Sequence, residues 1–437
     1  MIASRAADFK LEAVSSRLKG ELIHPNKSAG LSMIEFSPDG KRILAGDYPG
    51  GTIVLWDVVS GKLLTTIEAG YGYHATQYYY AVAPDWHTVF TWREKGKAEQ
   101  TVQNGKRMLR WTYDGSVRAW DLETGKLRRT YKHEPLHNVR VMKLAPDGKT
   151  LFTYDEVPGT FEGRGKNAIS LWDVPSGNSI VLDKLGSLGE YANVLSHDGK
   201  ALAITSANES YTACTLKLID VRSGQEKWSL PIREKNPWVN PRLFSRDDRL
   251  IFGTLQSLEQ PRKYDKRRTW MKWWDAKAGH EVASFACNPE DAFDGFTLSP
   301  DGRTLAIRNR GGGKCQLLLY SVAEKRLMQT IPVGDKKEGY YFIGSWPAFS
   351  PDGKWLAMVI SLYPEKSNPP RAEADPQDSP QPRISLIETA TGTIRETLIA
   401  PQAFSSRACF SPDGRTLATD GLGRVLLWDL SKPPGEK

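Results

Sequence analysis

Apolar residues recur along the chain at fixed distances from a repeated turn sequence. Ser-Pro-Asp-Gly begins at Ser37, Ser299, Ser350 and Ser411, and close variants begin at Ala83, Ala145, Ser196 and Ser245. Serine first, proline second and glycine fourth is typical of a type I turn. The residue before each turn is apolar in all eight copies, and so is the residue three positions after it. The pattern predicts two antiparallel strands that share one buried face.

A second repeated sequence follows each of these turns. The first copy, "LWDVVSGK", ends at Lys62, and Asp-x-x-Ser-Gly is typical of a short hairpin connection in which glycine takes a positive φ. Strands before and after it, such as Leu63–Ile67, complete a unit of four strands, a to d. The predicted units are 25–68, 69–132, 133–184, 185–232, 233–287, 288–333, 334–399 and 400–437.

Eight in-register copies that carry Trp-Asp pairs, as in Trp56-Asp57, resemble the WD40-repeat family. The resemblance implies an all-β fold: a single eight-bladed β-propeller of four-stranded antiparallel blades. Three units depart from the Trp-Asp pair, at Ile219-Asp220, Tyr320-Ser321 and Ile387-Glu388. The family's network of histidine, serine or threonine, aspartate and tryptophan is expected only in the second unit, from His74, Thr91, Asp114 and Trp120.

The eighth unit stops soon after Trp428-Asp429, which leaves it without a strand d. The resemblance implies that such a ring is closed by a strand from the other end of the chain. We therefore expect residues 1–24 to supply that strand, within Phe9–Ile23. Closure pairs two sheet edges that would otherwise stay open.

The net charge of +8 is concentrated in two connections between strands b and c. Arg93–Arg110 has six basic and two acidic residues, and Arg262–Lys272 has six basic and one acidic residue. Both are either solvated loops or a docking face for an acidic partner or a phosphate backbone. The candidate contact residues are Arg262, Lys263, Lys266, Arg267, Arg268, Lys95, Lys97, Lys106 and Arg107.

Aromatic residues occur in the d–a connections, which lie at the same end of the blades as the b–c connections. Tyr73, Trp238 and Tyr340 are therefore candidate contacts beside the cations, as in binding hot spots, or else they pack against the ends of the blades. A proline-rich insertion, Tyr363–Pro382, is predicted to be a loop.

Motifs for catalysis, metals and cofactors are weak. "HEPLH" (His133–His137) matches a zinc pattern that needs a helix, and Pro135 interrupts it. "GTFEGRGKN" (Gly159–Asn167) departs from phosphate-loop spacing. "GQEKW", ending at Trp228, is similar to the tryptophan-docking repeat of quinoprotein dehydrogenases but occurs once. Four separated cysteines predict no disulfide framework. We expect no metal and no cofactor.

The sequence thus predicts a non-catalytic scaffold that binds a protein partner, possibly an acidic one, through the face of b–c and d–a connections. The alternatives are a nucleic-acid or ribonucleoprotein-associated propeller and a propeller enzyme of quinoprotein type. No run of 18 apolar residues and no signal-like apolar region is present, so a cytoplasmic protein without a membrane partner is expected. The identity of the partner and the oligomeric state stay open.

Overall fold

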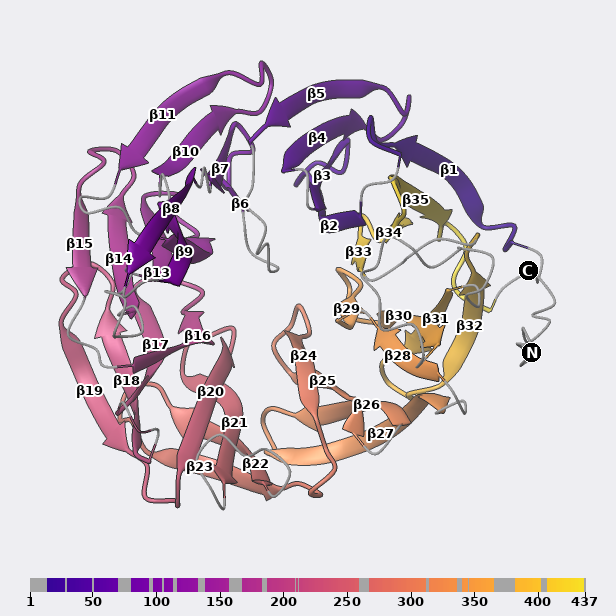
Figure 1. Ribbon diagram of the computed structural model, residues 1–437. Helices are drawn as coiled ribbons and strands as arrows, with labels where there is room; N and C mark the ends of the chain where they lie inside the picture. Colours follow the sequence, from indigo (N-terminus) through magenta and orange to yellow (C-terminus); the bar gives the residue numbers. More distant parts are fainter. Residues whose placement is uncertain are drawn as a thin grey trace, which may run out of the picture. The chain divides into compact units, whose positions relative to one another are not determined.

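The computed structural model describes residues 14–27, 30–48, 51–69, 80–93, 97–103, 106–112, 116–132, 138–156, 167–182, 187–208, 210, 212–258, 267–311, 314–335, 340–344, 346–364, 382–401 and 407–435. Every regular element in these ranges is a β-strand, and Figure 1 labels most of them. The expected all-β class is confirmed. Most of the strands form eight antiparallel sheets, or blades, and two others form a separate two-stranded sheet.

In each of the first four blades, the strands pair side by side in the predicted chain order a, b, c and d. The first is β2 (Gly30–Phe36), β3 (Arg42–Tyr48), β4 (Thr52–Asp57) and β5 (Leu63–Glu68). The second is β6 (Tyr80–Val82), β7 (Thr88–Arg93), β10 (Ser116–Asp121) and β11 (Leu127–Lys132). The third is β12 (Asn138–Leu144), β13 (Thr150–Glu156), β14 (Asn167–Asp173) and β15 (Ser179–Leu182). The fourth is β16 (Ser187–Leu195), β17 (Ala201–Ala207), β18 (Cys214–Asp220) and β19 (Glu226–Pro231).

The remaining blades repeat the arrangement, except that strand a of the seventh blade is in two pieces that both pair with β30. The fifth is β20 (Pro237–Phe244), β21 (Leu250–Leu258), β22 (Arg267–Asp275) and β23 (Glu281–Ala286). The sixth is β24 (Phe293–Leu298), β25 (Thr304–Asn309), β26 (Lys314–Ser321) and β27 (Arg326–Asp335). The seventh is β28 (Tyr340–Gly344), β29 (Ala348–Phe349), β30 (Trp355–Pro364), β31 (Arg383–Glu388) and β32 (Ile394–Ile399). The eighth is β33 (Ala408–Phe410), β34 (Thr416–Gly421), β35 (Arg424–Asp429) and β1 (Leu18–Ile23).

By their internal contacts, these blades fall into two compact units. The first unit contains the sixth, seventh and eighth blades with most of the first, and the second contains the second to fifth blades.

The N-terminal strand completes the eighth blade, as the missing strand d predicted. β1 pairs antiparallel with β35, with Leu22 opposite Val425. Leu22 is buried, and its core cluster contains Ile34 of the first blade together with Leu427 of the eighth. The eighth and first blades therefore share one apolar core, in which β1 takes part.

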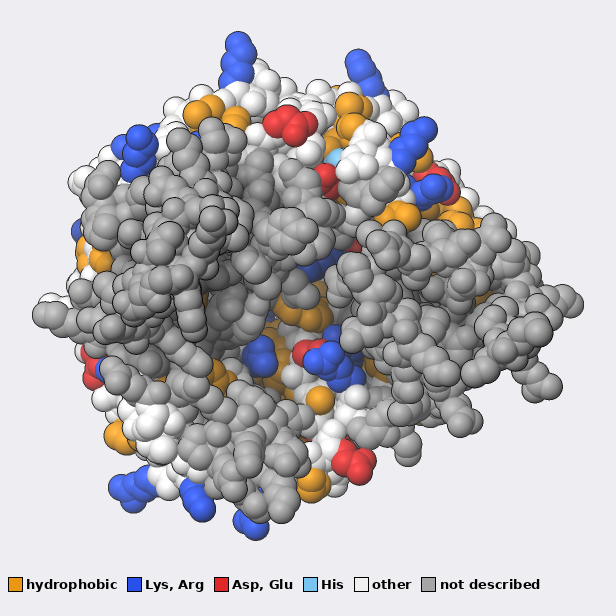
Figure 2. Space-filling view, in the orientation of Figure 1, with side chains coloured by type: hydrophobic (Ala, Val, Ile, Leu, Met, Phe, Trp, Pro, Cys, Tyr) orange, Lys and Arg blue, Asp and Glu red, His pale blue; other side chains and the backbone are white. Residues whose placement is uncertain are grey.

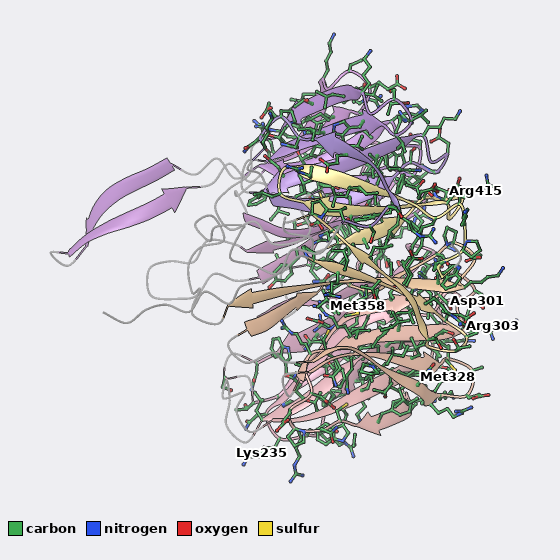
Figure 3. All side chains as sticks on the ribbon, turned by 90° about the vertical axis from the view of Figure 1, so that its right-hand side faces the viewer. Lys235, Asp301, Arg303, Met328, Met358 and Arg415 are labelled. Carbon is green, nitrogen blue, oxygen red and sulfur yellow. The ribbon has the colours of Figure 1, made fainter. Side chains whose placement is uncertain are left out.

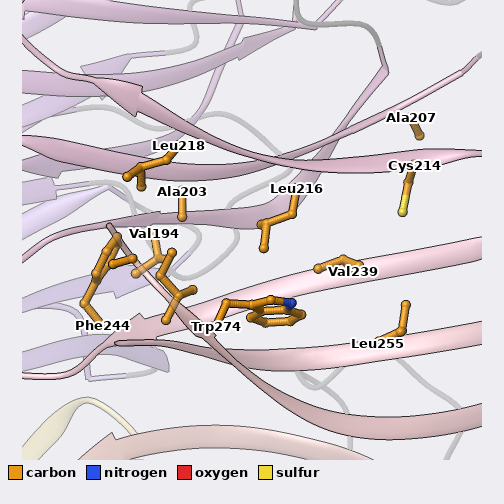
Figure 4. Packing of buried hydrophobic residues seen from close by; sticks show 12 residues of the cluster. Val194, Ala203, Ala207, Cys214, Leu216, Leu218, Val239, Phe244, Leu255 and Trp274 are labelled. Atoms are coloured by element: carbon orange, nitrogen blue, oxygen red, sulfur yellow. The ribbon is translucent and has the colours of Figure 1, made fainter. Parts of the chain in front are cut away.

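Apolar cores lie between successive blades within each unit. In Figure 4, Leu216 and Leu218 of the fourth blade face Val239 and Trp274 of the fifth, and all four are buried. Equivalent clusters join the second blade to the third, the third to the fourth, the sixth to the seventh and the seventh to the eighth. Successive residues of a strand point to opposite faces of the blade, and both faces pack against neighbouring blades. This burial explains why the same strand positions are apolar in every repeated unit.

Strand d of one blade also contacts the c–d turn of the next. Trp228 donates its Nε1–H to the carbonyl of Ala276 at 2.8 Å. Gly279, in the same turn, has a φ of +72°, and a Cβ there would lie 2.8 Å from the Trp228 ring. Only glycine satisfies both conditions. The quinoprotein-like "GQEKW" segment is thus a blade-to-blade contact in this chain.

Candidate interaction surface

The second blade carries an inserted two-stranded ribbon in its b–c connection. Strands β8 (Lys97–Gln103) and β9 (Lys106–Thr112) pair with each other from Lys97 opposite Thr112 to Gln103 opposite Lys106. They form a sheet of their own, to which no other strand of the described chain adds. Figure 3 shows the ribbon as a separate projection. The backbone of Lys97, Lys106 and Arg107 is therefore placed on this ribbon, whereas Lys95 lies outside the described residues.

The basic connection of the fifth blade is shorter than the sequence predicts. Arg267 and Arg268 already belong to strand β22, where they pair with Leu258 and Ser257 of β21. Arg268 is exposed, and exposed lysine and arginine side chains are visible on the face drawn in Figure 2. The other three candidates lie outside the described residues: Arg262, Lys263 and Lys266.

Lys272, at the end of this basic segment in the sequence, is not part of an exposed basic loop. Its side chain is buried, and Nζ lies 2.7 Å from Oε2 of Glu281 on the adjacent strand β23. The interpretation of Lys272 as part of a basic loop is wrong, because the strand begins before it and a carboxylate on the paired strand neutralises its charge.

The three aromatic candidates have different outcomes. Trp238 is half-buried on β20, packs against the core between the fourth and fifth blades, and donates its Nε1–H to Oδ1 of Asn240 at 3.0 Å. These contacts agree with the packing interpretation for this residue. For Tyr340 the backbone lies in β28, and Tyr73 is outside the described residues.

Two of the four residues predicted for the network of the second blade are described, and they are hydrogen-bonded to each other. Trp120 donates its Nε1–H to Oγ1 of Thr91 at 2.8 Å, and Thr91 is buried. His74 and Asp114 lie outside the described residues.

The tryptophan–threonine pair of this network also occurs in other blades. Trp172 donates to Oγ1 of Thr153 at 3.1 Å in the third blade, and Trp428 donates to Oγ1 of Thr419 at 3.0 Å in the eighth. The signal was available in the sequence, because a threonine stands at the same position of strand b in "TVFT", "TLFT" and "TLAT". A tryptophan needs only that hydroxyl oxygen to satisfy its N–H, so a full set of four residues was too strict a criterion.

A buried histidine also accompanies the first blade and was missed. His24 directly follows β1 and is buried, and its ring meets the ring of Trp56 edge-on at 6.4 Å. The backbone N–H of Asn26 donates to its Nδ1 at 3.1 Å. The contact ties the end of the closing strand to the core of the first blade.

The opposite ends of the blades carry the repeated a–b turns. In the sixth blade, Ser299 Oγ donates to Oδ1 of Asp301 at 2.6 Å and accepts the N–H of Thr304 at 2.9 Å. The hydrogen bond from Ser299, followed by one from the backbone N–H of Arg303, holds the pKa of Asp301 below its usual value. The same pair recurs in the first, fourth, fifth, seventh and eighth blades. Figure 3 shows Asp301 and Arg303 with Arg415 of the eighth blade on one side.

One junction between these turns is built differently. Asp248 stands where six of the other seven turns have glycine, and it has a φ of +56°. Its carboxylate accepts the N–H of His197 at 2.7 Å and the N–H of Asp198 at 2.9 Å, both in the turn of the fourth blade. Since His197 replaces the usual proline, it has an N–H to donate. The two departures from Ser-Pro-Asp-Gly therefore compensate each other.

A cleft of about 510 Å³ lies between the second and third blades beside their turns. Arg128 and Arg129 line it. Arg128 donates to Oγ1 of Thr88 at 2.7 Å and pairs with Asp121, while Arg129 donates to the carbonyl of Pro175 at 2.7 Å. Both guanidinium groups thus join neighbouring strands and turns.

Among the described residues, no group of three or more histidine, cysteine, aspartate or glutamate side chains is arranged to hold a metal ion. Burial raises the pKa of the Cys214 thiol to about 12 and that of Cys315 to about 11, and it also raises the pKa of Cys409. Such thiols stay protonated and are poor nucleophiles. The segment His133–His137 lies outside the described residues.

Among the described residues, no helix has the length and apolar character needed to cross a membrane.

Comparisons with known proteins identify the fold. No family model matches the chain. The C-terminal WD40 domain of Sif2 aligns with 97% of this chain and 100% of that chain, at 10% identity and a TM-score of 0.59. The β-propeller domain of Cps50 (Swd1) from Myceliophteria thermophila covers 94% of this chain and 98% of that chain, at 14% identity and a TM-score of 0.47. Hydrazine synthase from Kuenenia stuttgartiensis covers 96% and 99%, at 15% identity and 0.46.

One curated relative matches part of the sequence. A protein of Bacillus subtilis named "Uncharacterized peptidase YuxL" is 31% identical over 159 residues, which are 31% of this chain and 22% of that protein. The chain thus spans less than a quarter of the curated relative that it matches. The match to the WD40 domain of Sif2 and the eight four-stranded antiparallel sheets together show that this chain has the fold of an eight-bladed WD40 β-propeller.

Proposed function

We propose that the protein is a non-catalytic interaction platform that binds an acidic protein partner through the face of its b–c and d–a connections. The observation that carries the proposal is the ribbon β8–β9, which interrupts the second blade between strands b and c and forms a sheet of its own. A two-stranded ribbon is marginally stable alone in water, so contact with a partner would stabilise it.

Charge supports the kind of partner. The segment Arg93–Arg110 has six basic and two acidic residues, and Lys97, Lys106 and Arg107 lie on the ribbon itself. A concentration of positive charge speeds and orients association with an acidic surface. Arg268 adds an exposed cation at the corresponding end of the fifth blade. At the opposite ends of the blades, which carry the a–b turns, the aspartates lie beside lysines and arginines and offset their positive charge, as Asp301 does for Arg303.

The test compares two charge-neutralised proteins. One carries Lys97→Gln, Lys106→Gln and Arg107→Gln on the ribbon, and the matched control carries Lys41→Gln, Lys62→Gln and Lys126→Gln in exposed turns. Each is titrated against the partner that wild-type protein retains and against single-stranded RNA, at low and high salt. We expect the ribbon variant alone to bind the protein partner more weakly, with the larger difference at low salt.

The same titrations also distinguish binding of a protein partner from the alternative, binding of nucleic acid. Loss of RNA binding alone, with a steep dependence on salt, would favour a nucleic-acid-associated propeller. Equal binding by the ribbon variant, its control and the wild type would refute both docking proposals.

A further inference from the structure

The cleft between the second and third blades has the size of a binding site. Its volume of about 510 Å³ lies within the roughly 300–1,000 Å³ of ligand-binding clefts. Phe90 of β7, Ala119 of β10 and Val174, in the c–d turn of the third blade, line its apolar part. It is called the inter-blade cleft below.

A short side chain on strand c of the second blade contributes to this space. Ala119 pairs with Phe90 in the second blade, as Leu171 pairs with Phe152 in the third. Leu171 is buried in the core between the third and fourth blades, and Figure 4 shows the equivalent Leu218 in the core between the fourth and fifth. Leucine or tryptophan occupies this position in every unit except the second. The alanine therefore leaves room at a blade junction where the other units have a larger side chain.

Two carboxylates border the cleft and have fewer partners than their counterparts in other turns. Asp85 and Asp147 belong to the a–b turns of the second and third blades, which begin with alanine instead of serine. In the six turns that begin with serine, the serine Oγ donates to the aspartate. Four of those aspartates also pair with the lysine or arginine two residues later. Within the described part of the chain, Asp85 accepts only the N–H of His87, at 2.9 Å, and Asp147 only that of Lys149, at 2.8 Å.

The two arginines that line the cleft are engaged by the protein itself. Arg128 pairs with Asp121. Arg129 donates to the carbonyl oxygen of Pro175 at 2.7 Å, and its guanidinium lies 5.0 Å from the centre of the Tyr131 ring. With Asp121 and the two turn aspartates, three carboxylates accompany two guanidinium groups. This excess of negative charge, at groups with unused acceptor capacity, favours a cationic ligand.

We propose that the inter-blade cleft binds a lysine side chain of a protein partner. The methylene groups of the lysine would lie along Phe90, Ala119 and Val174, and its ammonium would stay in water between the carboxylates that border the cleft. An ammonium has three rotatable donors and can reach the carboxylates of two turns, whereas a guanidinium is a rigid planar fork. The ammonium would supply the donor that serine supplies in the other turns. The site lies at the end of the blades opposite to the ribbon, so it does not rest on the proposed function.

The experiment uses full-length protein labelled with ¹³C in its alanine methyl groups. NMR follows the methyl resonances of Ala83 and Ala119, which both line the cleft. The probes are n-butylamine and three blocked tripeptides, in which lysine, norleucine or glutamate stands between two glycines, at constant ionic strength. We expect the lysine peptide to shift both resonances saturably, to bind about tenfold more tightly than its neutral norleucine counterpart and to bind more tightly than butylamine. The glutamate peptide should leave both resonances unchanged.

Two variants and a control locate the binding. Asp85→Asn with Asp147→Asn keeps an oxygen for the N–H in each turn, and should weaken binding of the lysine peptide about tenfold. Ala119→Leu should abolish this binding, followed at Ala83, and should maintain or raise the unfolding midpoint because it fills the space. Glu123→Gln changes an exposed carboxylate of the same blade outside the cleft lining and should bind the peptide like the wild type.

Several results would overturn the inference. A lysine peptide that shifts neither resonance saturably would remove the site. Unchanged binding by the asparagine variant would do the same, whatever Ala119→Leu does to stability. Equal binding of the lysine and norleucine peptides would show an apolar cleft without recognition of charge. Binding of the glutamate peptide alone would assign the cleft to anions, and tighter binding of butylamine than of the lysine peptide would assign it to a small amine instead of a partner protein.

Discussion

Truncation of one buried side chain in β1 tests whether the N-terminal strand is part of the eighth blade. Leu22 is 2% exposed and packs in the core shared by the eighth and first blades, whereas Ile23, the next residue on the opposite face of the strand, is 46% exposed. Leu22→Ala should cost about 2–5 kcal/mol of unfolding free energy, the range for a leucine lost from a core. Ile23→Ala should cost about 1 kcal/mol or less, because half of that side chain is already in water.

The assay is urea unfolding followed by tryptophan fluorescence. Trp428 pairs in register with Leu18 of β1, and Trp56 lies in the same core cluster as Leu22, so the signal reports on this region. The variants should differ from each other in midpoint and not in slope. Equal and small losses for both substitutions would show that β1 is not in the sheet. A larger loss for Ile23→Ala would place the opposite face of the strand in the core.

Three further predictions concern single contacts. His197→Pro and Asp248→Gly should each lower the free energy of unfolding by about 1–3 kcal/mol, since each leaves polar groups unpaired. The double variant should lose less than the sum of the two, because it recreates the proline–glycine junction of the other blades. Strictly additive losses in urea unfolding would contradict the compensation. Trp428→Phe should cost about 1–3 kcal/mol, because it takes the N–H from the buried Thr419 hydroxyl, and adding Thr419→Val should recover part of that cost; no recovery would remove the case for the bond. Ser299→Ala should raise the pKa of Asp301 toward its ordinary value of 3.8. Because the folded pKa of Asp301 is the lower one, its contribution to stability is present above pH 3.8 and is lost as the pH falls through the folded value, so the variant should lose less stability on acidification below pH 4; an unchanged carboxyl titration by NMR would be the contrary result.

The sequence predicts most of the fold because the turns constrain both sides of each strand pair. Ser299, for example, fixes the a–b turn through hydrogen bonds within six residues of chain. The same serine–aspartate pair occurs in six of the eight turns and sets the register of the apolar columns. The missing strand of the eighth unit was predictable for the same reason, since the count of strands left only one segment to fill it.

The candidate site was harder to predict because its contacts are not local. In the sequence, Lys272 stands at the end of a basic segment. In the fold, Glu281 on the paired strand neutralises its charge. Lys143 and Asn193 are 50 residues apart in the sequence, and only the packing of successive blades brings the Lys143 ammonium to the carbonyl of Asn193. The ribbon was also missed, although its basic residues were noted, because its strand pairing is a property of the fold.

The central claim, that the ribbon end of the blades docks a protein partner, is tested most directly by site-specific photo-crosslinking. A photoreactive amino acid is placed at Gln103 on the ribbon in one protein and at Val59, which is 90% exposed in a c–d turn, in another. After irradiation in cells that express the protein and digestion of RNA, the products are identified by mass spectrometry. The account predicts one recurrent protein adduct, with an acidic surface, from Gln103 and none from Val59. Recurrent adducts from Val59 alone would contradict it.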